Sequence, residues 1–267
     1  MKKIFDIHTH VYPPKIADKA TYNLGRFYDF PVEGEGTIDD LEKSREFGVC
    51  GLLLLGVATN PTQVESVNTF LAETAKESRE RGFEAYAFMG MHQDHPDFAG
   101  ELDRAASLGL KGIKIHPDIQ GVDIDDRRLF ELYSLIEGKM PIYFHMGDDR
   151  EEYRFSTADK LSHVLSDFPR LKVGAAHFGG YKAWEDSLRV LKGRENVWFD
   201  TSSSLWAMDE DTANRALSVL GTERLMFGTD YPVKTVEEEL ALFDRLKLTD
   251  SQREDVLWKN AVRFLEL

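Results

Sequence analysis

Short apolar runs alternate with helix-like patterns along the whole chain, and this alternation restricts the fold more than any other feature of the sequence. Most of the runs are continuously apolar and rich in Val, Ile, Leu, Phe and Tyr. Strands that are covered on both faces have this composition, which is typical of a parallel sheet. Eight strands are predicted, at residues 3–8, 49–56, 83–90, 110–116, 140–146, 172–177, 196–201 and 224–229.

Helical patterns fill the intervals between these strands. Thr37 begins a segment that resembles a capping box, and Gly48 is placed to end the helix that follows. Asn60 and Pro61 predict the start of a second helix, which Gly82 closes. Further helices are predicted at residues 97–108, 126–137, 158–168, 181–193, 209–220, 236–246 and 250–265.

Repeated alternation of strand and helix in 267 residues predicts one domain, residues 1–267, with the fold of a (β/α)8 TIM barrel. The alternative is a doubly wound open sheet, which requires a glycine-rich phosphate-binding turn after its first strand. Residues 8–14 read His-Thr-His-Val-Tyr-Pro-Pro and contain no such turn. In a barrel, the active site lies at the C-terminal ends of the strands.

Charge and composition narrow the classes of function. The formal net charge of −14, from 33 basic and 47 acidic residues, disfavours nucleic acids and anionic membranes as partners. No apolar stretch approaches the roughly 18 residues of a membrane-spanning helix. Asp6 and His8 interrupt the first apolar run, so we expect no signal peptide. The single cysteine, Cys50, excludes an internal disulfide and indicates a reducing, cytoplasmic location.

Residues 11–36 form the longest stretch without a periodic pattern, directly after the first predicted strand. A loop of this length in a compact domain is usually functional. We therefore expect either a lid over an aromatic or carboxylate-bearing ligand or a well-packed cover on the barrel mouth. The side chains that would suit a lid are Tyr12, Tyr22, Arg26, Phe27 and Tyr28.

Histidines and one aspartate recur at, or just past, the ends of the predicted strands. They are His8, His10, His116, His145, His177 and Asp230. Because the C-terminal ends of parallel barrel strands meet at one mouth, we expect these side chains to gather there. His8 and His10 are two residues apart on an extended segment, so both imidazoles point the same way. Imidazoles and a carboxylate predict a divalent metal ion, with Zn favoured over Mn, Fe, Co or Ni.

These motifs resemble those of the amidohydrolase superfamily, in its amidohydrolase-related branch of metal-dependent TIM-barrel hydrolases. The resemblance covers nearly the whole chain and includes the ending Trp-Lys-Asn-Ala-Val-Arg-Phe-Leu, which is similar to the closing Asn-Ala-x-Arg helix of that branch. It implies that His8, His10, His145 and Asp230 hold one ion, and that His177 either binds a second ion or acts in catalysis. The motifs are specific for the superfamily and weak for the reaction.

The fourth predicted strand places Lys114 and His116 on one face. Some binuclear relatives carry a carboxylated lysine on this strand, and the resemblance makes Lys114 a candidate for that bridge between two ions. Lys114 is alternatively an ammonium group that binds a substrate carboxylate beside a His116 hydrogen-bond donor, or a side chain that extends to solvent. One ion is usual in the branch and is favoured here. Arg150, just past the fifth strand, is a further candidate anchor for a substrate anion.

Four other polar residues are less informative. Asp6 shares the parity of His8 and is a candidate hydrogen-bond acceptor one layer deeper in the barrel. His92 and His95 follow the third strand and suit either the barrel mouth or a surface loop. His163 falls on a predicted helix, where we expect a structural or exposed side chain.

These residues predict an enzyme. The favoured reaction is hydrolysis of an amide, lactone or ester by a metal-activated water, with Asp230 taking the proton and His177 polarising the carbonyl. Non-oxidative decarboxylation, or hydration, of an aromatic or unsaturated acid is second, because decarboxylase relatives tend to be longer. A metabolite-binding barrel without turnover is third. The expected partner is a small molecule, including carboxylate-bearing ones, and the resemblance also indicates a homodimer or larger assembly.

Overall fold

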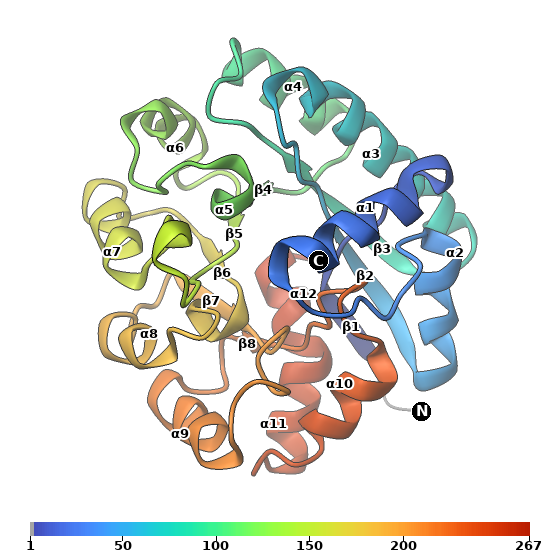
Figure 1. The fold of residues 1–267 in the computed structure, drawn as a ribbon, viewed down its shortest axis with the longest axis vertical. Helices are drawn as coiled ribbons and strands as arrows, with labels where there is room; N and C mark the ends of the chain where they lie inside the picture. Colours follow the sequence, from blue (N-terminus) through green and yellow to red (C-terminus); the bar gives the residue numbers. More distant parts are fainter. Residues whose placement is uncertain (1–2) are drawn as a thin grey trace.

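The apolar runs form eight parallel strands, which pair in chain order around a barrel (Figure 1). The computed structural model describes residues 3–267. Every strand overlaps its predicted run, so the expectation of a (β/α)8 TIM barrel is confirmed. The strands are β1 (Ile4–Thr9), β2 (Val49–Leu55), β3 (Glu84–Gly90), β4 (Ile113–Ile115), β5 (Ile142–Phe144), β6 (Val173–Ala175), β7 (Val197–Asp200) and β8 (Leu225–Met226).

The barrel closes between β8 and β1 through backbone hydrogen bonds at their C-terminal ends. The N–H of Asp230 donates to the carbonyl of His8 at 2.9 Å, and the N–H of His10 donates to the carbonyl of Tyr231 at 2.7 Å. Closure of the sheet therefore brings two candidate ligand histidines beside the candidate ligand aspartate.

The predicted helices cover the outside of the barrel, and their boundaries follow the expected caps. The Thr37 side chain accepts a hydrogen bond from the N–H of Asp40, and Gly48 ends that helical segment with φ 98°. The α-helices are α1 (Pro14–Tyr28), α2 (Ile38–Leu41), α3 (Val64–Glu80), α4 (Phe98–Ser107), α5 (Pro117–Gln120), α6 (Phe130–Ile136), α7 (Ala158–Asp167), α8 (Trp184–Val190), α9 (Glu210–Leu220), α10 (Val236–Phe243), α11 (Asp250–Glu254) and α12 (Asn260–Leu265). A π-helical segment, Asp255–Lys259, divides the predicted helix 250–265. Within residues 3–267, no helix combines the length and apolar composition needed to cross a membrane.

The expectation of an irregular stretch at residues 11–36 is wrong, because α1 occupies much of it. Pro14 at the first helical position favours the start of this helix. Only Ala17 of α1 is fully buried, so the helix lies over the mouth and is not anchored in the barrel core. Figure 1 shows α1 in front of the strands, apart from the outer ring of helices.

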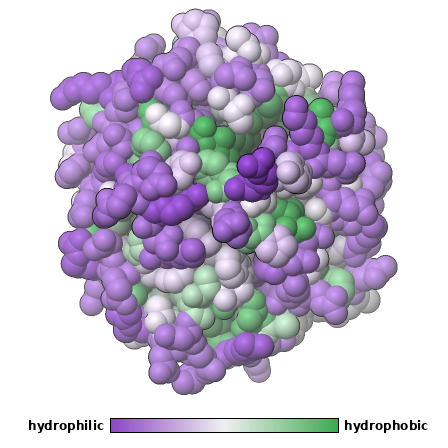
Figure 2. All heavy atoms as spheres, in the orientation of Figure 1, coloured by the Kyte–Doolittle hydropathy of each residue, from purple (hydrophilic) through white to green (hydrophobic). Residues whose placement is uncertain are grey.

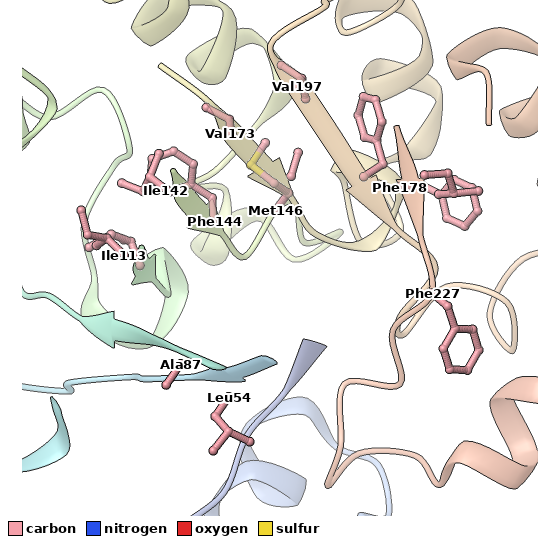
Figure 3. Close-up of a cluster of buried hydrophobic side chains, with 14 of the residues drawn as sticks. Leu54, Ala87, Ile113, Ile142, Phe144, Met146, Val173, Phe178, Val197 and Phe227 are labelled. Carbon is pink, nitrogen blue, oxygen red and sulfur yellow. The ribbon is translucent and has the colours of Figure 1, made fainter. Parts of the chain in front are cut away.

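Alternate strand residues divide the core into an outer and an inner layer. Figure 3 shows the outer layer, where side chains such as Leu54, Phe144 and Val197 pack between the strands and the helices. In the inner layer, the ring of Phe264 from α12 lies 5.9 Å from that of Tyr143. The ring of Tyr143 also packs edge-on against the imidazole of His8, with ring centroids 5.5 Å apart. The inner apolar layer therefore directly supports the mouth of the barrel.

Candidate active site

Four of the predicted residues form a compact group, here called the donor cluster: His8, His10, His177 and Asp230. Asp230 Oδ1 lies 3.2 Å from His8 Nε2 and 3.4 Å from His10 Nε2. One ligand atom from each of His8, His177 and Asp230 lies within 4.8 Å of the others. Neutral imidazole nitrogens and an anionic carboxylate oxygen meet at one point, and this set of donors fits a divalent transition metal ion.

Hydrogen bonds from behind orient two of these imidazoles. His8 Nδ1 lies 2.8 Å from Asp200 Oδ2, and His10 Nδ1 lies 2.9 Å from the carbonyl of Leu55. Each ring therefore presents Nε2 to the donor cluster, as carboxylate or carbonyl partners do for ligand histidines in metal sites. Burial alone would raise the pKa of Asp200, but the adjacent His8 imidazole lowers that pKa below its usual range.

Asp200 and Ser202, which the sequence did not single out, also fix His177. Asp200 Oδ1 accepts the backbone N–H of His177 at 2.9 Å, and His177 Nδ1 lies 2.9 Å from the carbonyl of Ser202. His177 and Asp230 both have left-handed backbones, with φ 61° and 59°. Such conformations are costly for residues other than glycine and concentrate at functional sites. Asp200 ends β7, so its strand-end position was the signal that could have identified it.

Burial sets the charge of these groups. Burial lowers the pKa of His8 and of His177 to about 4, and that of His145 to about 3. The imidazoles are therefore neutral at pH 7, which is the form that binds a metal ion. Burial opposes ionisation of Asp230 as well, but the neighbouring His8 holds the pKa of this carboxyl well below its usual range.

A second group, here called the β4 cluster, follows the donor cluster around the mouth. It consists of Lys114, His116 and Asp118, at two-residue intervals from the end of β4. His145 joins the two clusters, with Nδ1 3.0 Å from His177 Nε2 and Nε2 3.1 Å from Asp118 Oδ2. The His116 ring stacks on that of His145, with centroids 4.2 Å apart.

The β4 cluster is buried but poorly partnered. Within residues 3–267, His116 Nδ1 and both carboxyl oxygens of Asp118 have no hydrogen-bond partner, since the approach of Asp118 to His145 is a close contact without hydrogen-bond geometry. Lys114 Nζ lies 3.4 Å from His8 Nε2 and forms no ion pair with a carboxylate of this part of the chain. Burial lowers the pKa of Lys114 to about 8, and burial together with Asp148 raises the pKa of Asp118 to about 8. The sequence did not single out Asp118, although it shares the parity of Lys114.

The C-terminal end of α1 covers this part of the mouth. The hydroxyl of Tyr28 lies 3.2 Å from His116 Nε2 and 3.3 Å from His145 Nε2, so it can donate to only one of them. Figure 2 shows this face covered mostly by hydrophilic side chains, with apolar ones in several separate patches. The stretch after β1 thus lies over the mouth, as both expected roles, a lid and a packed cover, require, although Tyr22 is 64% exposed.

Arg150 holds this cover and does not join either cluster. Its guanidinium forms an ion pair with Asp148 at 2.7 Å and donates to the carbonyl of Phe27 at 2.7 Å. The same group lies over the Tyr28 ring, 5.3 Å from its centroid. Because Asp148 already balances its charge, the role of Arg150 as an anchor for a substrate anion stays a prediction.

The remaining candidates lie outside the two clusters. Asp6 is buried below His8 and accepts hydrogen bonds from the hydroxyl of Thr229 at 2.7 Å and its N–H at 3.0 Å, not from an imidazole ring. The N–H of His95 donates to the carbonyl of His92, which keeps both residues in a local turn. His163 is exposed on α7, as expected, 3.3 Å from a carboxylate oxygen of Asp125.

The fold and the donor cluster define a parallel (β/α)8 barrel with a candidate metal centre at the C-terminal mouth. A sequence model of the family described as Amidohydrolase matches residues 5–267, and the chain belongs to this family. Families of this kind are metal-dependent, which agrees with the donor cluster.

Two curated proteins and one solved structure that are similar to this chain carry the name of a decarboxylase. The decarboxylase orsB of Emericella nidulans is 28% identical over 247 residues, which cover 73% of each chain. The 2-amino-3-carboxymuconate-6-semialdehyde decarboxylase of Caenorhabditis elegans is 25% identical, over 62% of this chain and 58% of that protein. The structure of a dihydroxybenzoic acid decarboxylase from Polaromonas, with bound manganese and 2-nitroresorcinol, has a TM-score of 0.71 at 15% identity and covers 100% of this chain and 98% of the other. At that identity, the structural likeness establishes the fold.

Proposed function

We propose that the protein is a metal-dependent, non-oxidative decarboxylase of a small aromatic or unsaturated carboxylic acid. The observation that carries the proposal is Lys114, a buried ammonium group beside the donor cluster that forms no ion pair with a carboxylate of residues 3–267. A buried cation of this kind needs an anionic partner, and a substrate carboxylate supplies one. The names of the relatives above support the same reaction. Decarboxylation thus takes the first place that the sequence alone gave to hydrolysis.

The donor cluster is the proposed metal site. His8, His10 and Asp230 would hold the ion, with His177, which lies in one group with His8 and Asp230, or the adjacent His145 as a further ligand. With an ion bound, this site would supply Lewis-acid stabilisation of negative charge on the oxygens of the substrate. Zinc suits these donors, and manganese is the ion of the Polaromonas structure.

The side chains around this point bind the acid and move one proton. Lys114 binds and orients the carboxylate. Breaking the bond between the carboxylate and its carbon releases CO2 and leaves an electron pair on that carbon, which must take up a proton. That proton comes from the solvent, and the ionised Asp230, with the neutral His177 beside it, is the candidate group for passing it to the carbon. Tyr28 and α1 exclude water above the β4 cluster.

Hydrolysis of a lactone, ester or amide is the second candidate. The same Asp230 and His177 suit removal of a proton from water and polarisation of a carbonyl. The two reactions differ in their products, since hydrolysis gives an acid and an alcohol or amine without CO2. A barrel that only binds a metabolite gives neither product.

The test is product analysis with the metal-loaded protein. Hydroxylated benzoates and short unsaturated acids are incubated with the enzyme, and CO2 release and loss of acid are followed by mass spectrometry and chromatography. Lactones, esters and amides are assayed in parallel. We expect CO2 in equal amount to the acid consumed, no product from the metal-free protein, and turnover lowered about a thousandfold in Asp230→Asn. Hydrolysis products without CO2 from any acid would contradict the proposal.

A further inference from the structure

We propose that Asp118 is a specificity-determining residue, which accepts a hydrogen bond from a hydroxyl or amino group of the substrate. The proposal rests on the function proposed above, because it concerns the substrate of the same site. It names the chemical class more narrowly: an acid that carries an O–H or N–H donor, in preference to the same acid without one.

The first support is the state of the Asp118 side chain. Its carboxyl is completely buried, and both oxygens are without a hydrogen-bond partner among the described residues 3–267. Buried polar atoms in native proteins nearly always have a partner, and a group left without one costs free energy. Such a group in a candidate active site is explained by a ligand that supplies the missing hydrogen bond.

The second support is that the neighbouring lysine and arginine side chains form no ion pair with Asp118. Arg150 forms a two-point interaction with Asp148, at 2.7 and 2.9 Å. Lys160 is paired with Asp123. Lys114 is not held by a carboxylate elsewhere, yet like Arg150 and Lys160 it forms no ion pair with Asp118. No cation of residues 3–267 other than a protonated His145 is therefore placed to satisfy this carboxyl, and a ligand is the partner we infer.

The third support is location. One imidazole ring, that of His145, separates Asp118 from His177 in the donor cluster. Lys114 lies on β4 and Asp118 at the start of α5, with His116 between them. A small acid whose carboxylate meets Lys114 and the donor cluster therefore has its remaining substituents near Asp118.

Tyr28 indicates which substituent fits. Its phenolic hydroxyl lies 3.3 Å from His145 Nε2, the same nitrogen that Asp118 Oδ2 approaches to 3.1 Å. The structure therefore places a phenol hydroxyl at this point, and a substrate hydroxyl or amine fits the same position in place of that hydroxyl. In either protonation state a carboxyl keeps an oxygen that accepts a hydrogen bond, so an O–H or N–H donor is favoured over a methoxy group, which cannot donate.

The physical consequence is discrimination by loss of a hydrogen bond. A site built to bond a substrate O–H rejects the analogue without it strongly, because the buried protein group is then left unpartnered. We expect the hydroxylated acid to bind about tenfold or more tightly than the matched methoxy acid, which is the size of effect for one buried hydrogen bond to a charged or strongly polar group.

The experiment is calorimetric titration of the metal-loaded protein with benzoate, with 2-, 3- and 4-hydroxybenzoate and with the matched methoxybenzoates. Wild type should prefer at least one hydroxybenzoate over its methoxy partner by about tenfold. Asp118→Leu should abolish that preference. Asp118→Asn keeps the shape of the side chain and adds an amide donor, so the preference should narrow because the methoxy acid is now bonded as well. Thermal melts of the three proteins establish that each is folded.

The ratio of the affinities for the hydroxy and methoxy acids distinguishes a role of Asp118 in specificity from a purely structural role. If Asp118→Leu weakens all ligands equally and the hydroxyl preference survives, Asp118 has only a structural role and the proposal is wrong. A preference that vanishes in Asp118→Leu supports it even if no CO2 is ever released, in which case only the proposed reaction fails. CO2 release together with equal binding of the hydroxy and methoxy acids would support the proposed reaction and contradict the proposed role of Asp118. Wild type that binds none of these acids contradicts both proposals.

Discussion

The donor cluster and the β4 cluster hold similar residue types at the same barrel mouth, yet their surroundings differ. In the donor cluster, Asp200 fixes His8 and Ser202 fixes His177 through hydrogen bonds at 2.8 and 2.9 Å. In the β4 cluster, the polar atoms of His116 and Asp118 named above lack such partners in the described chain. The difference teaches that the partners behind a side chain, more than its type, distinguish a group that is preorganised for an ion from one that awaits a ligand.

The largest effect is expected at Asp230, which touches His8 and His10 in the donor cluster. Asp230→Asn keeps the size of the side chain but removes its charge and its ability to accept a proton. We expect turnover to fall by about a thousandfold, the scale of a lost acid–base group, with the substrate affinity less affected. Rates of CO2 release under single-turnover conditions measure this. A variant within a few-fold of wild type would remove Asp230 from the proton transfer.

The next effect concerns the support of the donor cluster. Asp200→Asn leaves the metal-facing nitrogens unchanged but weakens the hydrogen bond to His8 Nδ1. We expect metal affinity to fall about 10- to 100-fold, as for other carboxylates behind ligand histidines. Competition with a metal chelator measures the affinity. Asp126→Asn, the same change in an ion pair with the half-exposed Arg128, is the matched control and should leave it unchanged.

Sequence patterns predicted that the residues of the donor cluster gather at one mouth, but the resemblance assigned the ion to His8, His10, His145 and Asp230, whereas His177 is the residue that lies in one group with His8 and Asp230. His8, His10, His177 and Asp230 each stand at or just past a strand end, and a parallel barrel brings all strand ends together. The β4 cluster was only partly predictable. The importance of Asp118 depends on contacts with His145 and on the cover by Tyr28, and these segments meet only in the folded chain. The helix that carries Tyr28 was missed because α1 lies over the mouth and has little buried surface.

A smaller effect tests whether substitutions in the two clusters change the free energy of unfolding of the protein in opposite directions. Asp118→Leu removes an unpartnered buried carboxyl, so we expect the free energy of unfolding of the metal-free protein to rise by about 1 kcal/mol. Ser202→Ala removes a hydroxyl that donates to Asp200 at 2.6 Å, so we expect a fall of about 1 kcal/mol. Denaturant titrations measure both. Equal destabilisation by the two substitutions would contradict the distinction between the clusters.

The smallest effect tests a buried group outside the mouth. Glu239 on α10 is completely buried without a hydrogen-bond partner in residues 3–267, and burial raises its pKa well above the usual value. The folded state then holds a proton that the unfolded state loses above the ordinary pKa, so Glu239 destabilises the protein increasingly as the pH rises from that value. Glu239→Gln removes the titrating carboxyl and with it this pH-dependent loss of stability.

We therefore expect the stability of Glu239→Gln relative to wild type to increase between about pH 5 and pH 8. Denaturant midpoints measured across this range test the sign. The preference for hydroxybenzoates should stay at the wild-type value, because Glu239 lies outside both clusters. A relative stability that is flat or falls with pH would show that the Glu239 carboxyl ionises normally in the folded protein.

The most direct test of the division into two clusters is the metal content of three purified proteins, measured by plasma mass spectrometry after loading with zinc or manganese. We predict about one ion per chain in wild type and in Lys114→Met, and no retained ion in His8→Ala. Loss of metal from Lys114→Met, or about two ions per wild-type chain, would contradict the division. Lys114 would then belong with the metal ligands, as a carboxylated bridge, and could not be the partner of a substrate carboxylate.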